Sequence, residues 1–324
     1  MMATQSTVPS RDTLAEQGWA SLPSSYRIPE RTPSLEEAQQ YCRELAESHY
    51  ENFHVASWFL PKRLRPHFHS IYAYCRISDD LGDEVQSQAQ ALALLDVWQQ
   101  QVDACYRGEA KHPVFVALRE TIRVCDIPKQ PFDDLLTAFR QDQTVTRYAS
   151  MNDLLGYCRN SANPVGRLVL YACGYRDAER FALSDDTCSA LQLANFWQDV
   201  REDFGRGRIY IPQDAMTAAG VDESVIASGV ATSAFRTLLG EQIVYTRAMF
   251  ARGAKLIGMV DRELAVDLDL FTRGGLEILR AIEARQCDVL SARPTISKPR
   301  KAMLLLHALA GRFVPGMRPS GSMA

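Results

Sequence analysis

Apolar residues recur every three or four positions along most of the chain, which is the period of an α-helix. Leu95, Trp98 and Val102, for example, would all lie on one side of a helix. The expected helices cover residues 34–49, 67–82, 89–107, 113–122, 132–140, 151–173, 185–203, 235–260 and 264–290.

No alternating strand pattern, internal repeat or hairpin signal accompanies these helices, so we predict an all-α protein. Its main part is expected to be a single domain over residues 34–297. Residues 1–33 show no helical period, and Pro23, Pro29 and Pro33 interrupt any helix there, which predicts a loosely ordered extension of irregular coil. Residues 298–324 begin with basic side chains and continue with an apolar face, which predicts a separate C-terminal helix and tail.

Two local features refine this picture. Ser34 precedes two glutamates and an apolar run, so it is expected to cap the first helix of the main domain. Asn163-Pro164 lies inside the helix predicted over residues 151–173. Because proline removes a hydrogen bond and crowds the preceding turn, we expect a kink there.

Composition narrows the classes of function. The chain has 324 residues, 46% of them hydrophobic, and a net charge of −3 with no basic block, so general nucleic-acid binding is not expected. Eight cysteines without a Cys-x-x-Cys pair indicate reduced thiols of a cytosolic protein. No apolar run is long enough to span a bilayer. We therefore expect a cytoplasmic protein, at most peripheral on the inner face of the cell membrane.

A polar stripe lies in the stretch from Gln192 to Tyr210. Asn195, Asp199 and Asp203 recur every four residues, so in a helix they share a face that drifts by only about 40° per step. Stacked roughly 6 Å apart along the axis, their carboxylate and amide oxygens suit a hard cation such as Mg²⁺. We expect a metal-binding face on this helix.

A second acidic face lies in the helix predicted over residues 67–82. Asp79 and Asp83 are four positions apart and Asp80 is three before Asp83, which places three carboxylates together. Like charges at this spacing destabilise a helix by a few tenths of a kcal/mol each, and by more where water is excluded. A shared Mg²⁺ cluster that also holds a diphosphate explains two such helices better than helix stability does.

Three other interpretations of these acidic faces remain open. They can be solvated surfaces, although apolar neighbours such as Leu81 and Trp197 argue against this. An all-α nucleotide pyrophosphatase also uses two acidic helices and Mg²⁺, but it is expected to carry Glu-x-x-Glu pairs. A helical interaction scaffold would lose neither turnover nor metal affinity when Asp79 or Asp199 is replaced by alanine.

The motifs resemble those of the squalene/phytoene synthase family of head-to-head prenyl synthases. The resemblance rests on Asp-Asp-x-x-Asp at 79–83 with Tyr-Ala-x-Cys-Arg before it, and on Asn-x-x-x-Asp-x-x-x-Asp at 195–203 with Gly-Arg-x-Tyr-Ile-Pro after it. It extends from about Leu35 to Lys301. Within the family the chain is most similar to bacterial hydroxysqualene synthases of hopanoid biosynthesis, in the stretches 49–57, 161–168 and 195–199.

This resemblance implies an isoprenoid-synthase helical bundle around a central cavity, and a specific reaction. Presqualene diphosphate would lose its diphosphate with the help of Mg²⁺, and water would trap the rearranged cation to give hydroxysqualene. No NADPH is expected, and no dinucleotide motif is visible. The implied functional partners are a presqualene diphosphate synthase that supplies the substrate and a hydroxysqualene dehydroxylase that consumes the product.

The resemblance and the acidic motifs together assign roles to particular side chains. The expected metal ligands are Asp79, Asp80, Asp83, Asn195, Asp199 and Asp203. Catalysis is assigned to Asp79, Asp83, Asp199 and Asp203 together with Tyr72, Arg76 and Tyr157. The expected substrate contacts are Asn52, Phe53, Asp142, Gln143, Gln192 and Asn195, with Arg206, Arg208 and Tyr210 forming a lid over phosphate.

Three departures from the family pattern bear on the substrate. Residues 50–53 read Tyr-Glu-Asn-Phe where many relatives have Ser-Lys-Ser-Phe, and Gln198 stands where they have arginine. Both changes remove a cation expected to serve a second diphosphate, which favours a substrate with one diphosphate. Gly274-Gly275 stands where relatives have an aromatic residue and would leave room for water. A squalene, dehydrosqualene or phytoene-type synthase that joins two prenyl diphosphates is the alternative.

Overall fold

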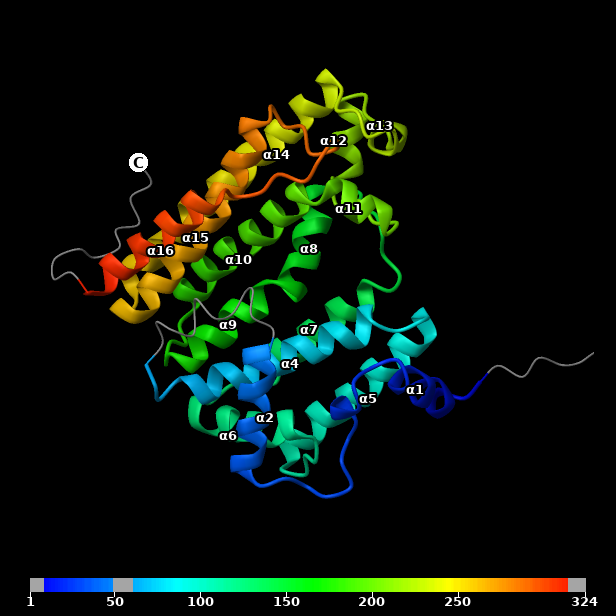
Figure 1. Cartoon of the computed structure of the whole chain (residues 1–324), viewed down its shortest axis with the longest axis vertical. Helices are drawn as coiled ribbons and strands as arrows, with labels where there is room; N and C mark the ends of the chain where they lie inside the picture. The colour runs from blue at the N-terminus through cyan, green and yellow to red at the C-terminus, as the bar shows by residue number, and fades with distance from the viewer. Residues whose placement is uncertain (1–8, 49–60, 314–324) are drawn as a thin grey trace, which may run out of the picture. The chain divides into compact units, whose positions relative to one another are not determined.

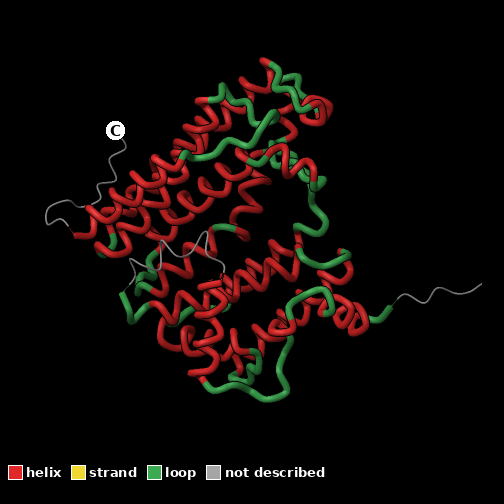
Figure 2. Tube along the Cα trace, viewed as in Figure 1, coloured by secondary structure: helices red, strands yellow, loops and turns green. Residues whose placement is uncertain are grey.

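The computed structural model describes residues 9–48 and 61–313. Helices and the loops between them make up this part of the chain, and Figure 2 shows no strand in it. The prediction of an all-α protein is confirmed. By its internal packing the chain divides into two compact units, and each is described by itself (Figure 1). Unit 1 comprises residues 1–54 and 65–144, and unit 2 comprises residues 55–64 and 145–324.

Unit 1 is built on two long helices, α4 (Arg65–Asp83) and α5 (Gln88–Arg107). They pack against each other, and α7 (Gln130–Gln141) contacts both. The helices α2 (Leu35–Ser48) and α6 (Pro113–Cys125) pack against α4 and against one another. These positions agree with the helices that the apolar period predicts.

The core of unit 1 is aromatic, and two of its aromatic side chains make hydrogen bonds within it. Trp98, Tyr74, Phe115 and Phe132 are fully buried, with Tyr74 and Phe132 in an edge-to-face contact at 5.1 Å. The Tyr74 hydroxyl donates to the Phe132 carbonyl oxygen at 2.8 Å, and the Trp98 indole donates to Ser78 Oγ at 2.9 Å. Tyr74 and Ser78 lie one turn apart on α4, so these bonds fix the rotation of the helix about its axis.

The first helix of the predicted main domain begins with a capping box. Ser34 Oγ accepts from the Glu37 amide at 3.2 Å, and a Glu37 carboxylate oxygen accepts from the Ser34 amide at 2.7 Å. Two amides that have no partner within the helix are thereby satisfied. The predicted cap at Ser34 is confirmed.

The expectation that residues 1–33 form irregular coil is wrong for their described part. Ser10 caps α1 (Arg11–Trp19), and a 3₁₀ turn, η1 (Ser24–Tyr26), follows. The helix lies between Pro9 and Pro23, so the prolines do not interrupt it. Trp19 is buried and α1 packs against α5, which stabilises a helix whose own sequence is only weakly amphipathic.

Unit 2 is organised around α10 (Ala178–Gln198), which contacts α14 (Ser233–Gly253), α15 (Arg262–Ala284) and α9 (Asn163–Ala172). In Figure 1 these long helices run beside one another, and α16 (Lys298–Phe313) lies along α15. The remaining elements are α8 (Met151–Ser161), α11 (Val200–Gly205), α12 (Gln213–Ala218), α13 (Glu223–Ser228) and the 3₁₀ helix η2 (Ala254–Met259).

Close packing of α10 on α14 depends on one glycine. A Cβ at Gly253 would overlap the Thr187 hydroxyl and would lie 2.8 Å from the Thr187 amide nitrogen. Nearby, the buried Trp197 of α10 donates its indole N–H to Thr246 Oγ1 of α14 at 2.8 Å. The core thus holds the C-terminal half of α10 in one orientation.

Several predicted helices of unit 2 are divided in the structure. The single kinked helix over residues 151–173 is two helices, with Ala162 between α8 and α9 and Pro164 in the first turn of α9. The helix over residues 185–203 begins earlier, at Ala178, and is interrupted at Asp199. The helix over 235–260 ends in η2, and that over 264–290 ends at Ala284.

All eight cysteines are free, and five of them are buried. The prediction that most of the thiols are buried is confirmed. In the described part of the chain, no helix is both long enough and apolar enough to cross a membrane.

Candidate active site

The acidic face of α4 is turned away from the aromatic core of unit 1. Tyr72 and Arg76 are half-buried, Asp79 is about half exposed, with 51% of its side chain accessible, and Asp83 is exposed. These positions follow one another at intervals of three or four residues, so they form one stripe along the helix. The structure therefore brings Tyr72, Arg76, Asp79 and Asp83 together, as the sequence predicts.

Asp80 is the exception in this motif. Its side chain is only 7% exposed, and the Arg76 guanidinium donates to both of its oxygens, from Nε at 3.1 Å and from Nη2. The Tyr26 hydroxyl donates to Oδ2 of Asp80 at 2.7 Å. A carboxylate held by three donors is well satisfied without a metal. Asp80 thus orients Arg76 and anchors the N-terminal segment, a role that the sequence prediction missed.

The electrostatics of Asp79 favour the binding of a cation. Burial, with a further contribution from the negative charge of Asp83, raises the pKa of Asp79 to about 6, although Arg76 opposes the shift from 3.8 Å away. A hard divalent cation would relieve both the desolvation and the repulsion.

Gln143, predicted to touch substrate, closes the end of α4. Its side-chain amide donates to the carbonyl oxygen of Gly82 at 3.1 Å and to that of Phe139 at 3.3 Å. These bonds satisfy carbonyl groups near the ends of α4 and α7. Asp142, which precedes it, is half-buried at the end of α7. The structure places both residues beside the first acidic motif, Gln143 with a positioning role.

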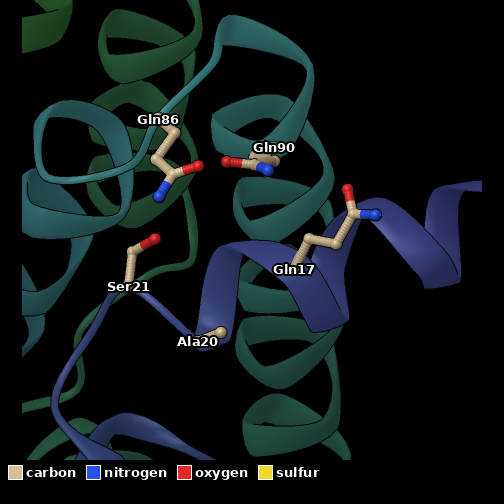
Figure 3. Close-up of a pocket in the computed structure, with 5 residues that line it drawn as sticks. All are labelled: Gln17, Ala20, Ser21, Gln86 and Gln90. Atoms are coloured by element: carbon tan, nitrogen blue, oxygen red, sulfur yellow. The ribbon is translucent and has the colours of Figure 1, made fainter.

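A separate cavity of unit 1, of about 720 Å³, lies between α1, α5 and the preceding loop (Figure 3). Gln86 and Gln90 point toward one another across it, and the remaining lining residues are Gln17, Ala20 and Ser21. None of these five side chains titrates near neutral pH, so the cavity offers hydrogen bonds but no acid or base.

In unit 2 the second motif spans the junction between α10 and α11. Asp199 is the residue between the two helices, with φ −104° and ψ 13°. The Asp199 amide nevertheless donates to the Asn195 carbonyl oxygen at 3.0 Å, and the Asp203 amide donates to the Asp199 carbonyl oxygen at 2.8 Å. These bonds preserve the four-residue repeat through the break. Asn195 is exposed, while Asp199 and Asp203 are half-buried.

Asp203 resembles Asp79 in its electrostatics. Burial and the neighbouring Asp199 raise the pKa of Asp203 to about 7, whereas Arg206 and Arg208 act in the opposite direction. The amides of both arginines donate to the Asp203 carbonyl oxygen, at 3.0 and 2.8 Å, so the loop folds back over the end of α11. Gly207, at φ 82°, permits this turn. The two predicted phosphate-binding arginines therefore lie beside the second motif.

Tyr210 is not part of a phosphate lid, because its ring is packed in the core. It is 8% exposed and stacks on Phe196 with ring centres 3.7 Å apart. Tyr157 and Tyr148 complete this cluster, at 6.1 Å and 5.8 Å from the Tyr210 ring. The cluster fixes α8, α10 and the loop after α11 relative to one another, and it holds Tyr157 near the second motif, where the family resemblance expects an aromatic residue.

One functional candidate was missed by the sequence analysis. Arg293 donates to both oxygens of Asp199, from Nε to Oδ1 at 2.5 Å and from Nη2 to Oδ2 at 3.1 Å. Arg293 Nη2 also donates to the side-chain oxygen of Gln198 at 3.3 Å. A cation is therefore present beside Gln198, where its loss was inferred from the sequence. Because 94 residues separate Arg293 from Asp199, no local pattern indicated the contact.

The remaining predicted residues are placed as follows. Gln192 is half-buried on α10, one turn before Asn195. Of the two glycines predicted to leave room for water, Gly275 is crowded, because a Cβ there would meet the Phe250 ring and lie 2.9 Å from Leu191, whereas a Cβ at Gly274 would meet nothing within 4 Å. Asn52 and Phe53 lie outside the described residues, so their predicted substrate contacts stay predictions.

The donor set of both motifs fits Mg²⁺ in chemistry, since it consists of carboxylate and amide oxygens. Within the described residues no three His, Cys, Asp or Glu side chains are grouped closely enough to form a metal site by themselves. Mg²⁺ usually keeps several waters and takes one or two carboxylates plus substrate phosphate. Asp79 and Asp203 therefore suit a Mg²⁺ ion whose remaining ligands are water and substrate phosphate.

Comparison with known proteins identifies the family. The 15-cis-phytoene synthase of Synechococcus elongatus is 28% identical over 288 residues, which are 85% of this chain and 94% of that protein. Squalene synthase HpnC from Alicyclobacillus acidocaldarius is 41% identical, with a TM-score of 0.75 over 83% of this chain and 98% of its own. A dehydrosqualene synthase solved with a ligand, at 24% identity and a TM-score of 0.77 over 85% of this chain and 96% of its own, shares the fold.

The helical architecture is thus that of the all-α isoprenoid synthases, as the motifs predicted. A family model described as squalene/phytoene synthase matches residues 46–300, a span that contains both acidic motifs, Arg76, Arg293 and the aromatic cluster. On this match, the chain belongs to the squalene/phytoene synthase family.

Proposed function

We propose that this chain is a Mg²⁺-dependent hydroxysqualene synthase, which converts presqualene diphosphate and water into hydroxysqualene and diphosphate. The observation that carries the proposal is the presence of two acidic faces, one on α4 with Asp79 and Asp83 and one across α10 and α11 with Asn195, Asp199 and Asp203. Burial and like charge at these faces raise the pKa of Asp79 to about 6 and that of Asp203 to about 7. Each lies in a separate acidic motif of a family that acts on prenyl diphosphates. Such carboxylates bind a cation more readily than solvated ones do.

Asp79 and Asp83 from unit 1, with Asn195, Asp199 and Asp203 from unit 2, are the proposed ligands. Bound Mg²⁺ would neutralise the charge that grows on the diphosphate as its bond to carbon breaks. Arg76, held in place by Asp80, and Arg206 and Arg208, beside Asp203, are the proposed arginine ligands of the diphosphate. Asp80 is left out of the ligand set because Arg76 and Tyr26 already occupy its oxygens.

After ionisation the protein has to hold a carbocation and admit a single water. Tyr72, on the acidic face of α4, and Tyr157, in the aromatic cluster, are the proposed aromatic neighbours of that cation. An aromatic face stabilises a desolvated cation by about 2 kcal/mol. This contribution is smaller than that of charge neutralisation at the diphosphate, so loss of a tyrosine should slow the reaction less than loss of a carboxylate.

A second reaction has specific support. The solved relative at 41% identity is a squalene synthase, and the sequence relatives are phytoene synthases, which favours a synthase that joins two prenyl diphosphates. Arg293 beside Gln198 also supplies a cation for a second diphosphate. This reaction would consume two farnesyl diphosphates and would not need presqualene diphosphate to be supplied.

Product analysis distinguishes the two reactions. The purified chain would be incubated with Mg²⁺ and either presqualene diphosphate or farnesyl diphosphate, and the lipid product identified by mass spectrometry, with Asp203→Asn as the inactive control. Hydroxysqualene formed from presqualene diphosphate but not from farnesyl diphosphate supports the proposal. A hydrocarbon formed from farnesyl diphosphate supports the second reaction. Inorganic phosphate released from nucleotides would instead indicate a pyrophosphatase.

We further propose a peripheral contact of α16 with the inner face of the cell membrane, where so apolar a product would reside. The helix packs on α15, and Arg300 approaches Glu277 at 3.7 Å, so one face is occupied. Met303 and Leu306 are 50% and 66% exposed beside basic residues, as in helices that bind anionic bilayers. Truncation after Arg300 should abolish binding to anionic liposomes; unchanged binding would reject the contact.

An upstream presqualene diphosphate synthase and a downstream dehydroxylase are the proposed pathway partners.

A further inference from the structure

The guanidinium of Arg293 forms a two-point ion pair with the Asp199 carboxylate. Nε and Nη2 each donate to a different oxygen, at 2.5 and 3.1 Å, and the Asp199 side chain is only 14% exposed. This two-point geometry is the strongest pairing available to a carboxylate from a side chain. In this structure Asp199 therefore already has a cationic partner, and that partner is part of the chain.

The segment that carries Arg293 is held to the second motif by hydrogen bonds at three points. Gln198 Nε2, which is buried, donates to the Pro294 carbonyl oxygen at 2.6 Å, and Arg201 Nη1 donates to the Leu290 carbonyl oxygen. The third point is Arg293, which pairs with Asp199 and also donates to Gln198 Oε1 at 3.3 Å. The segment leaves α15 through Gln286 and Cys287, which have φ values of 53° and 58°. Only the third contact involves a charge that can be exchanged for another cation.

A second partner for Arg293 lies beside the first. Arg293 Nε is 3.1 Å from Oε2 of Glu202, whose side chain is 54% exposed. The Arg293 side chain is itself 40% exposed. A small rotation of the guanidinium toward Glu202 would therefore free Asp199 without leaving a buried charge unpaired.

We propose that Arg293 is an internal competitor of Mg²⁺ at Asp199: it pairs with this carboxylate in the metal-free protein and moves to Glu202 when the metal binds. The inference rests on the proposed function, since it assumes that Asp199 binds Mg²⁺. Unit charges 4 Å apart interact by about 4 kcal/mol near a protein surface, so the Arg293 guanidinium and a metal bound to Asp199 would repel each other. The pairing therefore lowers the affinity of Asp199 for Mg²⁺ in the absence of substrate, and metal binding favours the move of Arg293 to Glu202.

The test compares Mg²⁺ binding in four proteins by calorimetric titration without any prenyl substrate. They are the wild type, Arg293→Gln, Arg293→Lys and the control Arg247→Gln. Arg247 makes a similar two-point pair with Glu283, at 3.2 and 2.6 Å, but does so in another part of unit 2. The control therefore loses an equivalent ion pair that has no contact with the acidic motif.

We expect Arg293→Gln to bind Mg²⁺ about fivefold or more tightly than the wild type. Arg293→Lys, which keeps the charge but loses the two-point geometry, should lie between them, and Arg247→Gln should match the wild type. In the wild type, Mg²⁺ should also speed amide hydrogen exchange in residues 288–297, because the Arg293–Asp199 pair that helps to hold this segment is broken.

Other outcomes overturn the inference in distinguishable ways. Equal or weaker Mg²⁺ binding by Arg293→Gln, with normal binding by the wild type, would show that Arg293 supports the metal or ignores it, and the proposed function would stand. No Mg²⁺ binding by the wild type, with or without inorganic diphosphate, would overturn the proposed function and the inference together.

Discussion

The Tyr26 hydroxyl donates a hydrogen bond to the buried carboxylate of Asp80 at 2.7 Å, and this bond joins the N-terminal segment to the first acidic motif. Because Asp80 also binds the Arg76 guanidinium, Tyr26 helps to set the position of a proposed phosphate ligand. The middle aspartate of the motif is thus a positioning residue, in contrast to Asp79 and Asp83 on the open side of α4.

This arrangement predicts different effects of neighbouring substitutions on stability. Tyr26→Phe should lower the free energy of unfolding by about 1 kcal/mol, because Asp80 keeps its Arg76 partner. Asp80→Asn should lower it by about 2 kcal/mol, because Arg76 loses its counter-charge in a partly buried place. Urea denaturation provides the measurement, with Asp83→Asn, at an exposed position, as the control expected within about 0.5 kcal/mol of the wild type. A normal stability of Asp80→Asn combined with lost Mg²⁺ affinity would return Asp80 to the ligand set.

Metal binding should depend on pH near neutrality. Mg²⁺ needs an ionised carboxylate, and the pKa of Asp203 is raised to about 7. Protons therefore compete with the metal below that value, and the affinity for Mg²⁺ should fall by about tenfold between pH 8 and pH 6. Calorimetric titrations at both pH values check this prediction. An affinity that does not change over this range would mean that Asp203 is not a ligand.

The metal-free protein should be less stable at pH 8 than at pH 5. The pKa of Asp79 is about 6 in the folded protein, above its ordinary value of 3.8. The folded state therefore holds this proton more tightly than the unfolded state, and stability is lost as pH rises from about 4 to about 6. After discounting for exposure, Asp79→Asn should raise the metal-free stability at pH 8 by about 0.5 to 1 kcal/mol. Thermal unfolding in a chelator is the test, and a lowered stability would contradict it.

Two glycines of α14 should respond oppositely to alanine. A Cβ at Gly253 would overlap Thr187 of α10, so Gly253→Ala should lower the free energy of unfolding by about 2 kcal/mol. A Cβ at Gly240 meets nothing within 4 Å, so Gly240→Ala should raise it by about 0.5 to 1 kcal/mol. Chemical denaturation of both variants measures the difference. Equal effects would mean that α10 and α14 do not pack as closely as described.

The helices of unit 1 were predictable because their cores are local and periodic. The apolar period placed α4, α5 and α6 to within a few residues. Ser34 could be recognised as a helix cap because a glutamate follows three positions later. By contrast, α1 was missed because its stability depends on packing against α5, which its own sequence does not show. The short helices α12 and α13 lack enough residues for any period to be visible.

The candidate site was predictable in composition but not in detail. Four-residue spacing identified Asp79, Asp83, Asn195, Asp199 and Asp203, since such spacing follows from the helical repeat alone. The role of Asp80 was hidden because its partner Tyr26 lies 54 residues away, and Tyr210 was misread because its stacking partner Phe196 belongs to another element. Partners that are distant in the sequence are fixed only by tertiary packing.

The central claim is that carboxylates of both acidic motifs hold one diphosphate through Mg²⁺. A double-mutant cycle tests it most directly, with Mg²⁺-dependent binding of inorganic diphosphate measured for the wild type, Asp79→Asn, Asp203→Asn and the double variant. We expect each single substitution to weaken binding by about tenfold or more, and the second to cost much less once the first is present. Fully additive losses, or a single substitution that leaves diphosphate binding unchanged, would contradict the account.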